Sequence, residues 1–356
     1  MRKYHPLEIE SLRTETNDSV RISLAVPEAL RAEFDFLPGQ HVPVQATVDG
    51  KRLRRTYSLC SAPGAECLEI GVRVQDGGQF SGFAAQALKV GDTLDVMPPV
   101  GRFHVEQDAP AGRRCLAIAA GSGITPILSI VRATLERDAD SSVVLFYGNR
   151  RQQSTMFIDD LCALKNRYPT RLVLQFLFSR EDQEFELMGG RLDAEKLNEL
   201  FDLYCDAAPP DVAYICGPDS LIPDVTDALI QRGVPAESIY AERFGAARGA
   251  GPKPPAAARQ EAPSVDVTVI MDGHERTFAV PADAPNLVDA AADNGVELPY
   301  SCKGGVCATC RTHLRDGDVE MHVNYGLEPW ELEQGYILAC QARPTSRRVT
   351  LDYDRT

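Results

Sequence analysis

Four cysteines near the C-terminal end of the chain have the spacing of an iron–sulfur site. Cys302, Cys307 and Cys310 form a C-x4-C-x2-C pattern, and Cys340 follows as a distant fourth thiol. This spacing is typical of a [2Fe–2S] cluster, in which each of the two irons is tetrahedral and binds two protein sulfurs. A zinc ribbon would need two short cysteine pairs instead. The glycine pair at 304–305 can adopt positive φ and bring backbone N–H groups close to the sulfurs. We therefore predict a one-electron carrier here.

The length and composition of the chain limit the classes of protein it can be. A chain of 356 residues with 44% apolar and 25% charged residues suits two or three globular domains. Its net charge of −14 argues against nucleic-acid binding, because a phosphate backbone would be repelled. No apolar run reaches the roughly 18 residues that span a bilayer, and the N-terminus lacks a secretory signal pattern. The low cysteine density fits a reducing compartment. We expect a cytoplasmic protein that binds no membrane.

Half of the net negative charge lies in the last quarter of the chain. Residues 265–356 contain 8 basic and 15 acidic residues, which gives −7. Such an excess either serves solubility or forms a docking surface for a positively charged redox partner, and the sequence favours neither reading. Trp330, the only tryptophan, is expected to pack in the core of this region, and a role as a partner anchor is the alternative.

The first 107 residues alternate short strand-like runs with turn signals, which predicts a small antiparallel β-barrel. The expected strands are residues 7–14, 20–25, 41–48, 54–59, 68–74 and 93–97. One of them carries Arg55, Tyr57 and Ser58. Tyrosine offers a flat face to a flavin ring, serine a hydrogen bond near its reactive nitrogen, and arginine a forked donor to a pyrophosphate. A glycine-rich turn then opens a helix, whose free N–H groups favour phosphate. This turn contains Gly78, Gln79, Phe80 and Ser81.

From about residue 113 the chain alternates strands with helices, which predicts a doubly wound parallel sheet. We expect strands at residues 115–119, 143–147, 172–178, 212–216 and 238–242, and helices at 127–137, 157–168, 194–200 and 222–232. A loop of sequence GSGITP, which includes Gly121, Thr125 and Pro126, follows the first strand, where a dinucleotide pyrophosphate is held. The second signal follows the fourth strand and consists of Cys216, Gly217 and Pro218.

Together and in this order, these motifs resemble the ferredoxin-NADP reductase family. The resemblance implies that Arg55, Tyr57, Ser58 and the turn at 78–81 bind FAD, and that Thr125 and Cys216 flank the nicotinamide. Ser58, Thr125 and Cys216 would then surround the reacting atoms. The backbone lining the flavin would be that of Val72, Arg73 and Val74. The family also places an aromatic residue over the flavin at the end of the nucleotide domain. Phe244 is the candidate here, and packing in a domain interface is the alternative.

Cys216 could instead be a covalent nucleophile. No histidine lies between His104 and His274 in the sequence to activate it, so we favour the nucleotide-binding role.

The ends of the second and third strands bear on the choice of nucleotide. No acidic residue closes the second strand to bind a ribose hydroxyl, whereas Arg150, Ser179 and Arg180 would suit a 2′-phosphate. The sequence therefore favours NADPH, and NADH stays open.

The pattern divides the chain into three domains and a linker. We expect a flavin-binding β-barrel at residues 1–107, an α/β nucleotide-binding domain at 108–245, a proline-containing linker at 246–264 and an α+β domain at 265–356. The last domain resembles the plant-type ferredoxins, which have a β-grasp fold, and Cys340 stands in the usual context of their fourth ligand.

This order of domains predicts an oxidoreductase that splits a hydride pair into single electrons. NADPH would reduce FAD, and FAD would reduce the cluster one electron at a time. Residues 317–328, with the domain order, resemble the reductase subunits of bacterial phenylacetyl-CoA epoxidases, which implies that a di-iron oxygenase in phenylacetate degradation is the acceptor. One alternative is the reductase component of a Rieske-type or other hydroxylase. An electron-transfer or redox-sensing protein without turnover is the alternative outside enzymes.

Overall fold

The computed structural model describes the chain except for residues 1–2, 106–107, 206–207, 245–263, 282 and 356. The chain divides into two compact units, of which one holds residues 4–53 and 57–244 and the other holds residues 54–56 and the C-terminal region. The expected linker lies outside the described residues apart from Ser264, which begins a strand. None of the helices in the described part of the chain is long and apolar enough to cross a bilayer.

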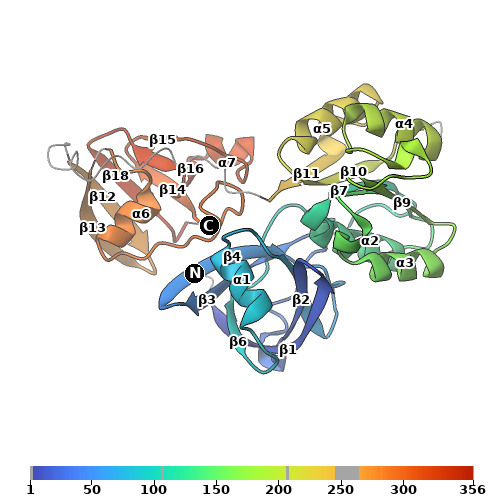
Figure 1. Ribbon diagram of the computed structural model, residues 1–356. Helices are drawn as coiled ribbons and strands as arrows, with labels where there is room; N and C mark the ends of the chain where they lie inside the picture. The colour runs from blue at the N-terminus through green and yellow to red at the C-terminus, as the bar shows by residue number, and fades with distance from the viewer. Residues whose placement is uncertain (1–2, 106–107, 206–207, 245–263, 282, 356) are drawn as a thin grey trace. The chain divides into compact units, whose positions relative to one another are not determined.

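The first third of the chain forms the expected antiparallel barrel (Figure 1). Its strands run in the order β4-β3-β6-β1-β2-β5. A bridge between Leu59 and Ile70 joins the two ends of this order and closes the sheet. The interior is filled by fully buried aliphatic side chains such as Leu7 and Ile22. The elements are β1 (His5–Thr16), β2 (Ser19–Ala25), β3 (His41–Val48), β4 (Lys51–Ser58), β5 (Cys67–Arg73), α1 (Gln79–Gln86) and β6 (Thr93–Val96).

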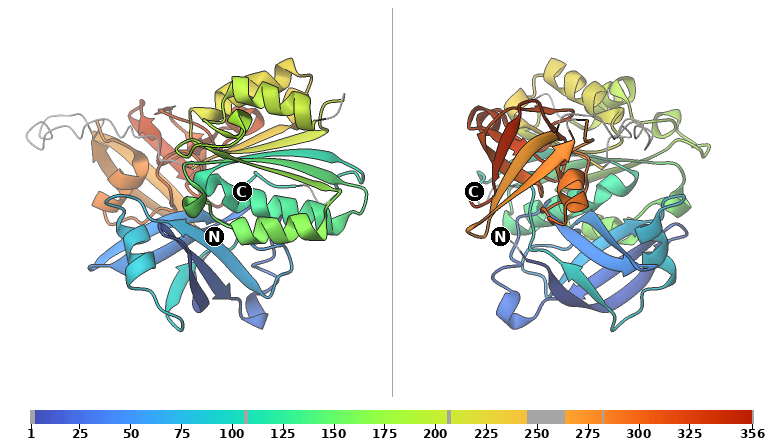
Figure 2. Two further views of the ribbon diagram at one scale, coloured as in Figure 1. Left: turned by 45° about the vertical axis from the view of Figure 1, so that its right-hand side comes forward. Right: turned by 90° about the vertical axis from the view of Figure 1, so that its left-hand side faces the viewer.

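The next region is a parallel sheet with helices on both faces, as expected. Its order is β11-β10-β7-β8-β9, and Figures 1 and 2 show α2 and α3 on one face and α4 and α5 on the other. The strands that follow β7 in the chain, β8 and β9, lie on one side of it, whereas β10 and β11 lie on its other side. The strand order therefore reverses between β7 and β10. Ligands of doubly wound sheets bind at such a switch point. The elements are β7 (Arg114–Ala120), α2 (Ile124–Arg137), β8 (Ser142–Asn149), α3 (Ile158–Arg167), β9 (Leu172–Phe178), α4 (Ala194–Tyr204), β10 (Val212–Gly217), α5 (Leu221–Gln231) and β11 (Ile239–Arg243).

The C-terminal region is a mixed sheet covered by a helix, in agreement with the expected α+β fold. The strand order is β13-β12-β18-β14-β16, and only the β12–β18 pair is parallel among these neighbours as described. Asp272 and Gly273 turn β12 into β13, both at positive φ, as a tight hairpin requires. The elements are β12 (Ser264–Met271), β13 (His274–Pro281), α6 (Leu287–Asp293), β14 (Arg311–Asp316), β15 (Val319–Met321), α7 (Pro329–Glu333), β16 (Tyr336–Leu338), β17 (Ala342–Pro344) and β18 (Arg348–Asp352).

One expectation about this region is wrong. Trp330, on the short helix α7, is 49% exposed and does not pack in the core. The side chain of the next residue, Glu331, is fully buried instead, because Arg311 donates to it over 2.7 Å. This one ion pair decides which face of so short a helix is buried.

A cluster of ion pairs joins the barrel to the nucleotide sheet. Asp160, on α3, accepts hydrogen bonds from Arg21 of β2 and from Arg132 of α2. Arg21 also donates to Glu15 over 2.8 Å, and the other carboxylate oxygen of Glu15 accepts the backbone N–H of Phe157. Partial burial disfavours the charged form of Asp160, but the hydrogen bonds and charges of both arginines outweigh it and hold the pKa of this carboxyl below its usual value.

Replacing Asp160 with asparagine should destabilise this unit by about 2 kcal/mol near neutral pH, because two largely buried guanidinium groups lose their shared anion. A lowered pKa in the folded state means that the contribution is present above the ordinary carboxyl pKa and is lost as pH falls through the lowered value. Urea unfolding from pH 3 to pH 8 would measure both effects. Asp202→Asn, which removes an exposed pair with Arg232, is the matched control and should change little. A loss that is independent of pH would contradict this role of Asp160.

Candidate flavin, nucleotide and iron–sulfur sites

The four predicted cluster ligands lie together as two pairs. The thiols of Cys302 and Cys307 hydrogen-bond to each other, and so do those of Cys310 and Cys340. Within the described residues, no three His, Cys, Asp or Glu side chains surround one common metal position. Two pairs of thiols are what a cluster of two irons requires, with each pair on one iron. The donor set therefore fits a [2Fe–2S] cluster.

The loop around these thiols supplies hydrogen-bond donors to sulfur. The backbone N–H of Gly304 lies 3.3 Å from Cys302 Sγ, and the hydroxyl of Thr309 lies 3.2 Å from Cys307 Sγ. The hydrogen bond from Cys307, followed by those of backbone N–H groups, lowers the pKa of Cys302 to about 5. Such donors favour the thiolate, which is the form that binds iron.

The backbone of the loop only partly follows the expectation from its glycines. Gly305 has φ of +74°, and a Cβ there would lie 3.0 Å from the carbonyl oxygen of Val323. Gly304 is not in the left-handed region, and Lys303 and Ala308 adopt it instead, at 52° and 51°. Three residues with left-handed backbone dihedrals within one short loop indicate that the group enclosed by the loop determines its shape.

The predicted flavin residues line one side of the barrel. Tyr57 and Ser58 end β4, and the ring of Tyr57 lies 5.5 Å from that of Phe80. Phe80 is buried, so only its backbone can reach a ligand. Arg55 is exposed, and Val72 and Arg73 end β5, with Val74 directly after them. The structure thus brings the β4 and β5 candidates to neighbouring strand ends, joined by the bridge that closes the barrel.

The glycine-rich turn has the form of a phosphate site. Gly78 is the N-cap of α1, and no side chain caps this helix, so its first N–H groups are available to a ligand. Ser81 fixes the turn, because its hydroxyl accepts the N–H of Gln75 and donates to the carbonyl of Gly78. A Cβ at position 78 would lie 2.4 Å from Ser81 Oγ, so a larger residue there would displace this hydroxyl.

The two nucleotide motifs meet at the switch point of the sheet. A Cβ on Gly123 would lie 2.1 Å from the carbonyl oxygen of Cys216, so the loop after β7 and the end of β10 touch through their backbones. Thr125 is buried at the start of α2 and donates to the carbonyl of Ser122 over 3.0 Å. Gly121, at φ of +57°, faces the guanidinium of Arg73, which places a cation beside the expected pyrophosphate loop. Pro126 lies in the first turn of α2, Gly217 ends β10 and Pro218 follows it directly.

Cys216 is poorly suited to act as a nucleophile. Its thiol is fully buried, and burial, followed by the charge of Glu242, raises its pKa well above the ordinary value. A thiol in this environment stays protonated and inert.

Sequence reasoning missed a buried carboxylate at this junction. Glu242, on β11, is 9% exposed and pairs in register with Cys216 of β10. Ser58 Oγ donates to Glu242 Oε2 over 3.1 Å, and His41 Nδ1 lies 3.4 Å from Glu242 Oε1. One carboxylate therefore connects the predicted flavin residue Ser58 with the strand end that carries Cys216. Phe244, two residues later, is 42% exposed.

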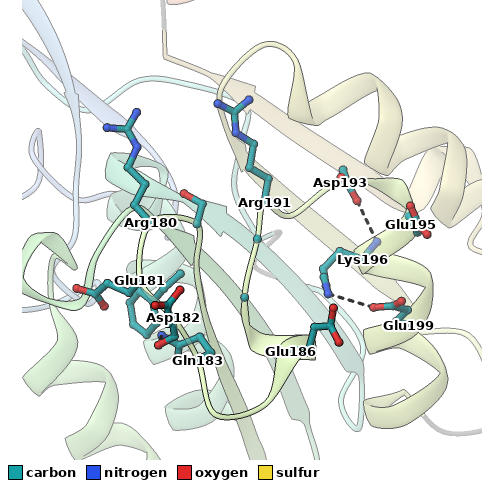
Figure 3. A pocket seen from close by; sticks show the side chains of 14 residues that line it. Arg180, Glu181, Asp182, Gln183, Glu186, Arg191, Asp193, Glu195, Lys196 and Glu199 are labelled. Atoms are coloured by element: carbon teal, nitrogen blue, oxygen red, sulfur yellow. Dashed lines mark hydrogen bonds and ion pairs between the residues drawn. The ribbon is translucent and has the colours of Figure 1, made fainter.

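A cavity of about 670 Å³, lined by both acidic and basic side chains, lies at the carboxyl end of β9. Ser179 and Arg180 line it, as does Arg191, which sequence reasoning missed. Figure 3 shows both guanidinium groups extending in the same direction, away from the acidic side chains of the cavity. Within the described part of the chain, no ion-pair partner neutralises either arginine. Arg150 is exposed, and its carbonyl accepts the N–H of Arg180 over 2.9 Å, but it does not line this cavity.

Comparison with protein families identifies three segments. Residues 6–105 match the oxidoreductase FAD-binding domain, residues 117–227 the oxidoreductase NAD-binding domain, and residues 269–345 the 2Fe-2S iron-sulfur cluster binding domain. These matches confirm the expected FAD, pyridine nucleotide and [2Fe–2S] groups.

Known proteins resemble the chain over its whole length. One subunit of the 1,2-phenylacetyl-CoA epoxidase of Escherichia coli K12 is 42% identical over 99% of both chains. The ferredoxin reductase component of the 3-ketosteroid-9-alpha-monooxygenase of Rhodococcus rhodochrous is 33% identical, over 98% of this chain and 96% of the other. Among solved structures, phthalate dioxygenase reductase is similar with a TM-score of 0.60 and 24% identity, over 98% of both chains.

Proposed function

We propose that this chain reduces a phenylacetyl-CoA oxygenase. The premise is its family: the chain belongs to the ferredoxin-NADP reductase superfamily, in the branch with a C-terminal [2Fe–2S] domain. The chain is an oxidoreductase and the reductase component of an oxygenase system. We assign its acceptor to the di-iron class. The similarity to the epoxidase of Escherichia coli, over 99% of both chains, supports this choice. The six cysteines outside the cluster site form no disulfide, which supports a cytoplasmic location.

The structural observation that best supports electron transfer from the nicotinamide to the flavin is the Ser58–Glu242 hydrogen bond at 3.1 Å. It connects the barrel to the strand neighbouring Cys216, so the predicted flavin and nicotinamide residues share one buried carboxylate. The flavin, when bound, accepts a hydride and releases single electrons. Ser58 and Glu242 would hold a proton close to its reactive nitrogen, Thr125 and Cys216 would exclude water, and the N–H groups of α1 would bind phosphate.

The acceptor can be tested by reconstitution. Purified holoprotein and NADPH should support oxygenation of phenylacetyl-CoA by a phenylacetyl-CoA oxygenase complex, with NADPH consumption coupled to product. The same holoprotein should couple poorly to a Rieske oxygenase. Coupling to the Rieske enzyme alone would overturn the proposal and favour the second candidate, a hydroxylase reductase, which the 33% identity to the ketosteroid monooxygenase component supports.

We propose that Arg180 and Arg191 bind the 2′-phosphate of NADPH. Replacing either with alanine should raise the KM for NADPH about 10- to 100-fold, the effect of one lost charge-assisted hydrogen bond, and should change the KM for NADH little. Ferricyanide reduction with each nucleotide measures both constants. Arg167→Ala, at an exposed arginine on α3, is the matched control and should behave as wild type. Equal effects on NADPH and NADH would show that the arginines do not read the 2′-phosphate.

A further inference from the structure

An exposed segment beside the cysteine loop presents large apolar side chains to solvent. We call residues 324–333 the aromatic segment. Tyr325 is 50% exposed, Trp330 49% and Leu332 42%, and these are the large hydrophobic side chains that the described part of the C-terminal region leaves exposed. Half-exposed tyrosine and tryptophan are the residues that most often dominate the energy of a protein interface.

The backbone of the aromatic segment is fixed, so these rings are presented in a defined place. Asn324 accepts the N–H of Leu327 over 2.8 Å and donates to its carbonyl over 3.0 Å. Glu328 and Glu331 form a capping box at the start of α7, with the N–H of Glu328 2.9 Å from Glu331 Oε2. The short helix that carries Trp330 is therefore held at its first turn. A preorganised anchor binds with a small entropy cost.

Both ends of the segment are attached to the predicted cluster site. The N–H of Tyr325 donates to the carbonyl of Gly305, in the cysteine loop, over 3.0 Å. At the other end, the buried carboxylate of Glu331 accepts from Arg311, which follows Cys310 directly in the chain. A protein that contacts Tyr325 and Trp330 would thus lie against the loop that encloses the thiols, where an electron acceptor has to bind.

The charge around the segment indicates what kind of partner fits. Glu320, Glu328 and Glu333 are exposed on or next to it, in a region with a net charge of −7. Acidic groups around an apolar centre favour a partner surface with an apolar socket and a rim rich in lysine or arginine. They also raise the association rate of the two proteins.

We infer that the aromatic segment is the docking surface for the oxygenase component, with Trp330 as its central anchor. This inference rests on the proposed function. The oxygenase component contributes an apolar socket for Trp330 and a basic rim for the glutamates. Electron-transfer complexes bury small interfaces, so a single anchor of this size carries much of the affinity.

Steady-state kinetics with the purified holoprotein test the inference. Trp330→Ala should raise the KM for the oxygenase component by about 30-fold, the size of a hot-spot truncation, and Trp330→Phe should retain most of the affinity. Anaerobic bleaching of the cluster by NADPH and turnover with ferricyanide should both equal wild type. Val90→Ala removes an exposed apolar side chain from the barrel and serves as the control.

A direct signal is available because the chain has one tryptophan. Protein labelled with 5-fluorotryptophan should give one fluorine resonance, which should shift when the unlabelled oxygenase component is added. A wild type that couples to the oxygenase while Trp330→Ala keeps the same KM would overturn the inference and leave the proposed function intact. Slower cluster reduction by NADPH in Trp330→Ala would show that the segment serves the flavin side instead. A wild type that fails to couple would overturn the proposed function, and the inference with it.

Discussion

Replacing Cys340 with alanine should abolish electron delivery to the oxygenase while leaving the reduction of the flavin by NADPH intact. The thiol of Cys340 pairs with that of Cys310, and the loss of either leaves one iron without its second protein sulfur. Apart from Arg55, the flavin and nucleotide motifs lie in a separate compact unit, so we expect their chemistry not to depend on this thiol.

Two measurements on the Cys340→Ala variant separate these steps. The electron paramagnetic resonance signal of the reduced cluster should vanish, and the flavin absorbance should still bleach when NADPH is added without oxygen. Cys162→Ala, at an exposed free thiol on α3, is the matched control and should keep both signals. A normal cluster signal in Cys340→Ala would show that this residue is not a ligand.

Replacing Gly123 with alanine should lower kcat/KM for NADPH by at least about 100-fold, the usual effect of moving a reacting group by about 1 Å. The new Cβ would lie 2.1 Å from the carbonyl oxygen of Cys216, and a backbone atom of a buried strand end cannot move aside as a flexible side chain could. The start of α2, with Thr125, and the end of β10, with Cys216, would have to separate.

Ferricyanide reduction would measure this loss, and flavin content and the cluster signal would show that the rest of the protein is intact. Gly82→Ala is the matched control, because a Cβ at position 82, inside α1, meets no atom within 4 Å. It should retain activity and gain a little stability, since alanine is the better helix former. Full activity in Gly123→Ala would contradict the proposed role of this backbone contact.

Sequence reasoning could predict those parts of the sites whose residues lie close together in the chain. The cysteine motif, the turn at 78–81 and the loop after β7 each place their polar groups through adjacent backbone, so spacing alone is informative. The parallel sheet was predictable for a similar reason, since alternating strands and helices leave few other arrangements.

The residues that the sequence did not reveal depend on tertiary contacts. Glu242 lies 184 residues from Ser58, and nothing next to it in the chain indicates that its carboxylate is buried. Arg191 and Arg180 line the same cavity because the chain returns to the end of β9 before α4 begins. Phe157 was expected in a helix but adopts φ of 58°, because its N–H is bound by Glu15 and its ring packs under Arg21. Trp330 was misplaced because the pairing of Glu331 with Arg311 decides which face of α7 is buried.

Rapid mixing with NADPH in the absence of oxygen measures the order in which the flavin and the cluster are reduced. The flavin absorbance should bleach first and the cluster signal should follow, and protein stripped of its flavin should leave the cluster oxidised. Two results would contradict electron flow from NADPH through the flavin to the cluster. One is reduction of the cluster by NADPH in the flavin-free protein, and the other is a cluster that stays oxidised while the flavin is reduced.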